Sequence, residues 1–203
     1  MAADAFTPEE VRALRSLWPL DPARAFTNHG SYAVSQPVLN VAMGFAERIA
    51  RNSNAFFVQD RGPLLTEARG SVATFVGADP EGVAFVPNVT TAASVLAASM
   101  RFQAGDEIVV TSHGYGAVTM AMQRYAADAG ARVVTARLSL TPTTEEIASA
   151  IAEVTTRHTR LVVLDHITSM TARLYDVATI AEPFDRKGFW SPSTVRTPRG
   201  PST

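Results

Sequence analysis

Cysteine is missing from this sequence of 203 residues, and lysine occurs once, at Lys187, beside 17 arginines. The lack of cysteine excludes disulfides, thiolate metal ligands and cysteine nucleophiles. A mechanism that requires a lysine has only Lys187 to draw on. The four histidines form no i, i+4 pair of the kind that holds zinc on a helix, so we predict no metal site.

Strong charge and long apolar runs are missing as well. The formal net charge is −1, which argues against a nucleic-acid-binding protein, because such proteins neutralise phosphates with a basic surface. No segment approaches the roughly 18 uncharged apolar residues of a membrane span. Residues 1–6 lack the basic and apolar regions of a signal peptide. With 46% apolar and 18% charged residues, we expect a globular cytoplasmic protein.

The first 77 residues have the pattern of helices. Residues 7–10, with the sequence Thr-Pro-Glu-Glu, form a capping box with proline at the first helical position, which predicts a helix start. Apolar residues at helical spacing follow Pro37 and again Pro63, and they predict two more helices. We therefore interpret residues 1–77 as a helical segment that leads into a second domain.

From residue 83 the pattern changes to alternating strands and helices. Short apolar runs without polar alternation are typical of strands that are buried on both faces of a parallel sheet. Helical stretches lie between these runs, and the last stretch begins with a second capping box. The alternation predicts right-handed βαβ crossovers and a partial α/β domain over residues 78–188. The expected strands are 83–86, 108–110, 132–134 and 161–164, and the expected helices are 91–102, 115–129 and 143–156.

Residues 189–203 differ from the rest of the chain. Ten of these 15 residues are proline, serine, threonine or glycine, and none is acidic. This composition predicts a disordered or non-homologous tail. The abrupt change after residue 188 is the pattern expected of a frameshifted or partial gene.

The residues after the first predicted strand are candidates for a binding site, since ligands of α/β sheets bind beyond the carboxyl ends of the strands. Thr90 and Thr91 follow this strand and begin a helix. The free amides and the dipole of a helix start favour an anion such as phosphate. An ordinary threonine N-cap explains the same pattern.

Histidine and hydroxyl side chains follow the second and fourth predicted strands. His113 is suited either to stacking on a planar ligand or to an ordinary surface position. The glycines of residues 114–119 resemble an incomplete dinucleotide fingerprint, which leaves a nucleotide-binding α/β domain as an alternative. Thr168 and Ser169 could donate hydrogen bonds to a ligand oxygen.

Six segments of the chain follow one another in the order of a known family: 26–32, 75–79, 85–92, 105–108, 112–117 and 165–169. Together they resemble the class V aminotransferase-like enzymes that use pyridoxal phosphate, and within these the isopenicillin N epimerase-like branch. The resemblance implies a three-layer α/β fold with a mainly parallel sheet. This fold is the large domain of fold-type I transferases, and the resemblance covers only its N-terminal part.

The resemblance also implies pyridoxal 5'-phosphate as the cofactor and assigns residues of this chain to it. Residues at a helix start would cradle the phosphate, and a histidine would stack on the pyridine ring. The implied cofactor-binding residues are Thr90, Thr91 and Ala92 at the phosphate, His113 at the ring, and Thr168 and Ser169 near the phenolic oxygen.

Substrate contacts follow from the same resemblance. It places Asn28, His29 and Gly30 in a loop near the substrate carboxylate, and Arg61 near the entrance of the active site. Enzymes of this kind are generally homodimers that act on small amino acids. Their reactions are epimerisation, transamination or desulfuration at the α-carbon. We expect no nucleic-acid or membrane partner.

Two residues that this chemistry requires are not found in the sequence. Family members have an aspartate that binds the pyridine nitrogen, and a Schiff-base lysine, both beyond the position that corresponds to residue 188. Lys187 precedes that region at the end of a helix, so we do not expect it to bind the cofactor covalently. We therefore predict no catalytic residues and an inactive chain. The alternative is a non-catalytic module that binds the cofactor or pairs with a full-length homologue.

Overall fold

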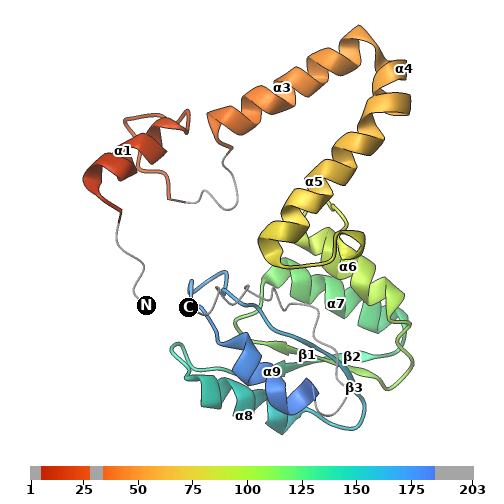
Figure 1. Ribbon diagram of the computed structural model, residues 1–203. Helices are drawn as coiled ribbons and strands as arrows, with labels where there is room; N and C mark the ends of the chain where they lie inside the picture. Colours follow the sequence, from red (N-terminus) through yellow and green to blue (C-terminus); the bar gives the residue numbers. More distant parts are fainter. Residues whose placement is uncertain (1–5, 28–33, 186–203) are drawn as a thin grey trace, which may run out of the picture. The chain divides into compact units, whose positions relative to one another are not determined.

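A computed structural model describes residues 6–27 and 34–185 of the chain (Figure 1). Two compact units, residues 1–70 and 71–203, meet inside the helix α5(Arg61–Val76). The domain boundary that the sequence predicts between residues 77 and 78 stays a prediction. In the two described ranges, no helix combines the length and the hydropathy that crossing a membrane requires.

Helices make up the described secondary structure of the first unit. The capping box is confirmed, because Thr7 Oγ1 accepts a hydrogen bond from the Glu10 amide at 3.2 Å and the Thr7 amide donates to the Glu10 carboxylate at 2.8 Å. The helix predicted from Pro37 starts one residue earlier, and a short helix and a π-helical turn precede the helix predicted from Pro63. The elements are α1(Pro8–Ser16), α3(Gln36–Arg51), α4(Ser53–Ala55), η1(Phe56–Asp60) and α5.

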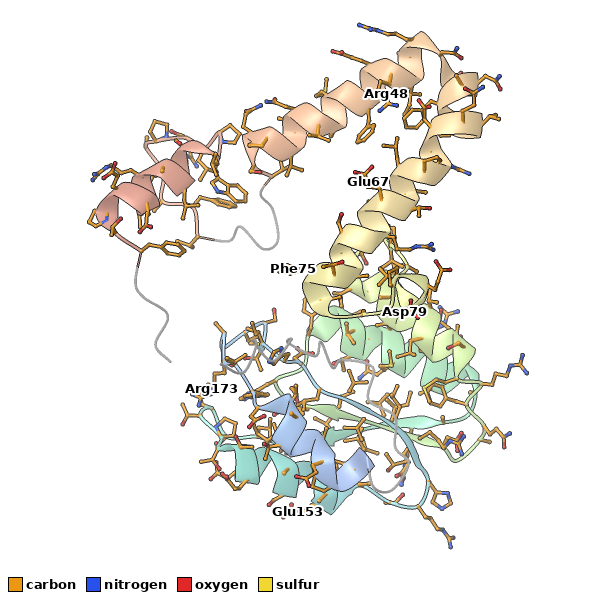
Figure 2. The ribbon with its side chains drawn as sticks, in the orientation of Figure 1. Arg48, Glu67, Phe75, Asp79, Glu153 and Arg173 are labelled. Atoms are coloured by element: carbon orange, nitrogen blue, oxygen red, sulfur yellow. The ribbon has the colours of Figure 1, made fainter. Side chains whose placement is uncertain are left out.

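Arg48 joins α3 to the π-helical turn η1 (Figure 2). Its guanidinium donates to the Asp60 carboxylate at 2.8 Å and lies 5.7 Å from the ring centroids of both Phe45 and Phe56. The ion pair is partly exposed, so it contributes at most about 1 kcal/mol, and each cation–π contact adds a similar amount. Arg48 therefore stabilises the turn that leads into α5 and its first residue, Arg61.

A parallel sheet of three strands, in the order β2-β1-β3, organises the second unit. Its strands β1(Glu107–Thr111), β2(Arg132–Ala136) and β3(Thr159–Val163) confirm three of the four predicted runs. The strand predicted at 83–86 is wrong, since in the described chain this segment pairs with no strand and Phe85 is 52% exposed. An apolar, β-branched run becomes a strand only when another strand supplies partners for its backbone groups.

Helices cover both faces of the sheet (Figure 1). Ile108 and Val110 of β1 pack on one face with α6 and α7, whereas Val109 packs on the other face with α8 and α9. The second capping box is confirmed, because Thr143 Oγ1 accepts from the Glu146 amide at 3.2 Å. These helices are α6(Val89–Ser99), α7(Gly116–Asp128), α8(Thr144–Val154) and α9(Val177–Asp185), and the 3₁₀ turn η2(Pro80–Gly82) precedes them.

The strand order requires the chain to cross the sheet in both directions. From the central strand β1 the chain passes to β2 at one edge, and then back past β1 to β3 at the other edge. Right-handed crossovers in opposite directions place their helices on opposite faces, as α7 and α8 show. Helix α9, which follows β3, packs on the same face as α8, so the loops after β1 and β3 lead to different faces of the sheet. Ligands of open α/β sheets bind at such a point, beyond the carboxyl ends of the strands.

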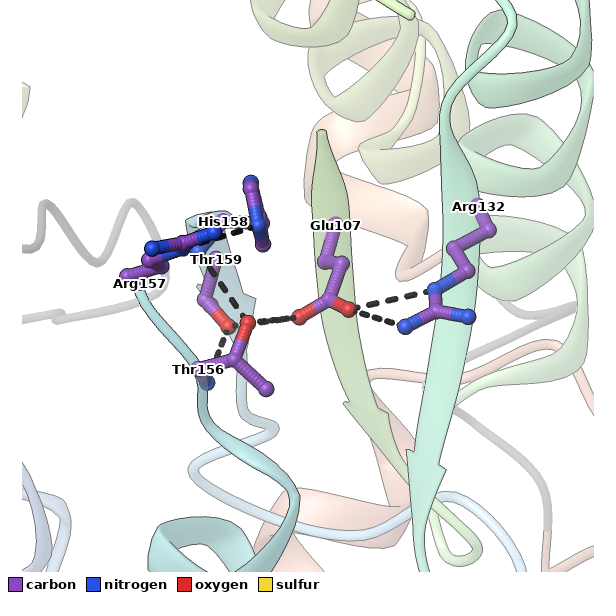
Figure 3. A network of polar contacts seen from close by, with 6 residues as sticks. All are labelled: Glu107, Arg132, Thr156, Arg157, His158 and Thr159. Atoms are coloured by element: carbon purple, nitrogen blue, oxygen red, sulfur yellow. Dashed lines mark hydrogen bonds and ion pairs between the residues drawn. The ribbon is translucent and has the colours of Figure 1, made fainter. Parts of the chain in front are cut away.

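A buried carboxylate, Glu107, ties the amino ends of all three strands together (Figure 3). Glu107 is 1% exposed, and it accepts hydrogen bonds from Thr156 Oγ1 at 2.6 Å and from Thr159 Oγ1 at 3.2 Å. Arg132, the first residue of β2, forms an ion pair with the same carboxylate. The hydrogen bonds from Thr156 and Arg132 hold the pKa of Glu107 below its usual range, although burial acts in the opposite direction.

Replacement of Glu107 by glutamine keeps the shape of the side chain and removes its charge. We expect Glu107→Gln to lower the free energy of unfolding by about 1.5–3 kcal/mol, the range for a hydrogen bond to a charged group. Because folding lowers the pKa of this carboxyl, the stabilisation is present above the unfolded pKa of about 4.3 and is lost as the pH falls through the folded pKa. Urea denaturation at several pH values measures this difference.

Glu153→Gln is the matched control, because Glu153 is exposed in the last turn of α8. We expect it to change the free energy of unfolding by no more than about 0.5 kcal/mol. Equal losses in the two variants, or a loss in Glu107→Gln that persists unchanged in acid, would contradict the role given to Glu107.

Candidate functional site

The loops after β1 and β3 are joined by two hydrogen bonds at the carboxyl edge of the sheet. His113 follows β1, and its Nδ1 lies 2.7 Å from the hydroxyl of Tyr175. The backbone amide of Tyr115 donates to Oδ2 of Asp165 at 2.9 Å, and Asp165 follows β3. These bonds link residues that are 62 and 50 positions apart in the sequence. His113 and the start of α7 are therefore fixed to the chain that leaves β3.

Burial changes the titration of both acidic groups in these contacts. It raises the pKa of the Asp165 carboxyl, and the hydrogen bond from the Tyr115 amide opposes that rise. Burial also raises the pKa of Tyr175, which is 4% exposed; Arg173 opposes the rise and Asp165 adds to it. Tyr175 is therefore a protonated phenol at neutral pH, with a hydroxyl that donates as well as accepts.

The loop between β3 and α9 folds back on itself as a narrow turn. Ile167 and Leu174 form an antiparallel bridge. Thr168 is 2% exposed. Its hydroxyl lies 2.7 Å from Thr171 Oγ1 and accepts a hydrogen bond from the Arg173 amide at 2.9 Å. This hydroxyl is therefore engaged inside its own turn. The neighbouring Ser169 is exposed.

Asn88, and not a threonine, caps the amino end of α6. Its side-chain oxygen accepts from the Thr91 amide at 2.9 Å and from the Thr91 hydroxyl at 3.1 Å. The interpretation of Thr90 or Thr91 as the N-cap is wrong, because the helix begins earlier, at Val89. Thr90, Thr91 and the following Ala92 lie in the first turn and are half-buried. The amides of Val89 and Thr90 belong to the helix positions that have no intrahelical acceptor.

The start of α6 lies toward the same edge of the sheet as His113. The short connection 100–106 joins the carboxyl end of α6 to the amino end of β1. Ala97 of α6 and Ile108 of β1 belong to the same apolar cluster on one face of the sheet, where α6 packs against α7 (Figure 1). A helix of 11 residues is about 16 Å long, and a strand of five residues spans about 17 Å. Helix α7 runs from the carboxyl end of β1 to the amino end of β2, and α6 lies beside it and leads to the amino end of β1. The first turn of α6 therefore lies toward the carboxyl edge (Figure 1).

The structure places the predicted site residues unevenly. Thr90, Thr91, Ala92, His113, Thr168 and Ser169 all belong to the second unit, at the first turn of α6 and in the loops after β1 and β3. Arg61 belongs to the first unit, where it is exposed at the start of α5. Asn28, His29, Gly30 and Lys187 lie outside the described residues. The assignment of these residues to a cofactor or a substrate stays a prediction.

Two residues of this site do not emerge from the sequence analysis. Asn88 stands three residues before Thr91, which is the spacing of a side-chain N-cap, so this contact had a local signal. No local sequence signal pointed to Tyr175, because the loop turns at Ala172, with φ 50°, before Tyr175 reaches His113.

The family of this chain follows from its match to a protein-family model. Residues 27–191 match the family model described as aminotransferase class-V. The chain belongs to the class V aminotransferase family. Enzymes of this family use pyridoxal phosphate. The match extends three residues past residue 188, the end of the predicted domain.

Curated relatives in this family include two isopenicillin N epimerases. The chain is 31% identical to the enzyme of Amycolatopsis lactamdurans over 174 residues, which cover 83% of the chain and 44% of the relative. It is 30% identical to the enzyme of Streptomyces clavuligerus over 172 residues, with 83% and 43% covered. The chain therefore spans less than half the length of these relatives.

Solved structures show the same fold. The cysteine desulfurase CsdA from Escherichia coli superposes with a TM-score of 0.72 at 22% identity, over 93% of this chain and 48% of that one. A variant of C-DES with glycine covalently linked to its pyridoxal phosphate cofactor gives a TM-score of 0.69 at 20% identity, over 81% and 45%. The predicted three-layer α/β fold of fold-type I enzymes is thereby confirmed.

The donors at the carboxyl edge fit the groups of pyridoxal phosphate. The first turn of α6 offers the Thr90 hydroxyl, the positive end of the helix dipole and two amides that have no hydrogen-bond partner among the described residues. Together they suit a phosphate. The ring of His113 is half-buried and held at one nitrogen, so it suits a planar aromatic group. The hydroxyl of Thr168 does not fit the role of a free donor, because its turn already engages it.

The cap of α6 provides a test of this geometry that needs no ligand. We expect Asn88→Ala to lower the free energy of unfolding by about 1 kcal/mol, because the Thr91 amide loses its acceptor. Asn88→Asp keeps an acceptor and adds a negative charge near the positive end of the helix dipole, so it should retain or increase the stability. Thermal denaturation of the two variants tests this order, and a greater loss in Asn88→Asp would contradict it.

Proposed function

We propose that this chain forms the phosphate-binding and ring-stacking part of the pyridoxal phosphate site of a class V enzyme that acts on a small amino acid at its α-carbon. The observation that carries the proposal is the position of two features at one sheet edge. The first turn of α6 offers free amides at Val89 and Thr90, and His113 follows the neighbouring strand. Epimerisation is the reaction that fits best, given the similarity to the two isopenicillin N epimerases.

The first turn of α6 holds the cofactor phosphate in this proposal. Hydrogen bonds from amides and a hydroxyl to a charged phosphate are each worth about 1.5–3 kcal/mol. Asn88 turns its side-chain oxygen to Thr91, which leaves the amides of Val89 and Thr90 for the phosphate. When bound, the cofactor supplies an electron sink for charge that develops at the α-carbon of the substrate. The residues described above bind and orient it.

These 203 residues do not carry out the reaction by themselves in this proposal. The sequence contains a single lysine, Lys187, which follows α9. Helix α9 begins beside Tyr175 at the carboxyl edge and leads away from it along the face that α8 covers. Covalent attachment of the cofactor and proton transfer at the α-carbon then require groups that this chain does not provide.

Non-covalent binding tests the proposed site directly. Pyridoxamine phosphate has no aldehyde, so it binds without reacting with Lys187 or with the amino terminus. We expect the chain to bind pyridoxamine phosphate at least tenfold more tightly than pyridoxamine, because only the former has the phosphate. Isothermal titration calorimetry measures both affinities. Equal affinities would contradict the phosphate site, and tighter binding of NADP would favour a nucleotide-binding domain.

The cap variants separate the ligand from the fold. Asn88→Asp keeps the cap, but its carboxylate lies beside the proposed phosphate. We expect it to weaken pyridoxamine phosphate binding about tenfold and to leave pyridoxamine binding unchanged. Glu153→Gln, far from α6 in the sequence, should change neither affinity. An Asn88→Asp protein that binds pyridoxamine phosphate like the wild type would place the phosphate elsewhere.

Covalent attachment is a separate test of the proposed inactivity. We expect the wild-type chain with pyridoxal phosphate to show no strong absorbance band from a cofactor bound to a lysine, and no racemisation of amino acids. Lys187→Arg should leave the spectrum unchanged. A strong band that disappears in Lys187→Arg would contradict this part of the proposal and would assign the covalent role to Lys187.

A further inference from the structure

We propose that Tyr175 is a positioning residue that fixes the tautomer and the orientation of the His113 ring. The inference rests on the proposed function, because the reason to position this ring is its stacking on the cofactor. The observation is the contact of 2.7 Å between the Tyr175 hydroxyl and Nδ1 of His113. The two residues come from loops that diverge after β1 and β3.

Because Tyr175 is surrounded by apolar side chains, its hydroxyl depends on His113 Nδ1 for a hydrogen bond. Tyr175 is 4% exposed and packs with Leu164, Val177, Ile180 and other apolar residues on the α8 and α9 face of the sheet. A hydroxyl that is buried among apolar side chains costs free energy unless it forms a hydrogen bond. In the described part of the chain, Nδ1 of His113 is the only partner of this hydroxyl.

This partnership sets the tautomer of His113. If Nδ1 carried the proton, it would donate to the tyrosine oxygen, and the buried hydroxyl hydrogen of Tyr175 would lose its acceptor. If Nδ1 is unprotonated, the hydroxyl donates to it and both groups are satisfied. The second arrangement places the proton of the neutral imidazole on Nε2. It leaves Nε2–H as the only polar edge of the ring that is free to face a ligand.

The rest of the loop holds the pair in place. The Tyr175 amide donates to the His166 carbonyl at 2.9 Å, and the Tyr115 amide donates to Asp165 at 2.9 Å. Two hydrogen bonds therefore join the loop after β1 to the chain after β3. One is formed by the side chain of His113, and the other by the amide of Tyr115. The apolar neighbours of Tyr175 pack it in place, so its hydroxyl holds the imidazole ring in the orientation of the 2.7 Å contact.

Nitrogen NMR of the free protein tests the tautomer. The chain is labelled with ¹⁵N-histidine, and the His113 signals are assigned by their disappearance in His113→Gln. We expect the neutral imidazole of wild-type His113 to be the Nε2–H tautomer, with the Nδ1 shift of a hydrogen-bond acceptor. In Tyr175→Phe, we expect the Nδ1 signal to move and the two tautomers to mix. A wild-type His113 with its proton on Nδ1 would overturn the proposal without any variant.

Ligand binding tests the orientation. We expect Tyr175→Phe to weaken binding of pyridoxamine phosphate roughly three- to tenfold, the equivalent of one neutral hydrogen bond. The control is Tyr125→Phe, which removes a hydroxyl from a half-buried tyrosine that packs on the opposite face of the sheet. It should leave both the His113 signals and the affinity unchanged.

The outcomes separate this proposal from the proposed function. If the wild type fails to bind pyridoxamine phosphate but Tyr175→Phe moves the His113 signals, the cofactor site is wrong and the positioning role stands. If the wild type binds and Tyr175→Phe changes neither the signals nor the affinity, the positioning role is wrong. A Tyr175→Phe protein that does not fold leaves the wild-type tautomer as the deciding measurement.

Discussion

The handedness of the crossovers is the constraint on which the arrangement of the second unit depends. A central strand whose neighbours on the two sides come later in the chain needs one crossover in each direction. Since both crossovers are right-handed, α7 and α8 must cover different faces. Helix α9, which follows β3, lies on the α8 face, so the loops after β1 and β3 lead to different faces, and His113 and Asp165 lie where these loops separate. The site is thus a consequence of strand order, and the side chains add the chemistry.

The amino and carboxyl ends of the strands differ in their polar groups. At the amino edge, Glu107 binds two threonine hydroxyls and an arginine, which belong to β2, to β3 and to the loop that precedes β3. At the carboxyl edge, the amides of Val89 and Thr90 at the start of α6 point outward, and Asn88 caps the helix without occupying them. At the amino edge the carboxylate is neutralised by its partners. At the carboxyl edge the helix start has a partial positive charge that favours a bound anion.

Local patterns made much of this fold predictable. Both capping boxes are present, and the runs 108–110, 132–134 and 161–164 became strands because each has a neighbouring strand to pair with. The run 83–86 is also apolar but pairs with no strand in the described chain, and composition alone does not predict pairing. The position of His113 was predictable because it directly follows a strand. Tyr175 contacts His113 only because of an irregular turn, which no sequence periodicity predicts.

The central claim is that the carboxyl edge of this sheet holds the phosphate and the ring of the cofactor. Amide NMR of the ¹⁵N-labelled chain, titrated with pyridoxamine phosphate, maps the contact residue by residue. We expect the largest shifts on Val89, Thr90 and Thr91 and around His113, with no change at Glu107 at the opposite edge. Shifts that centre on the Glu107 network, or that leave the first turn of α6 unaffected, would contradict it.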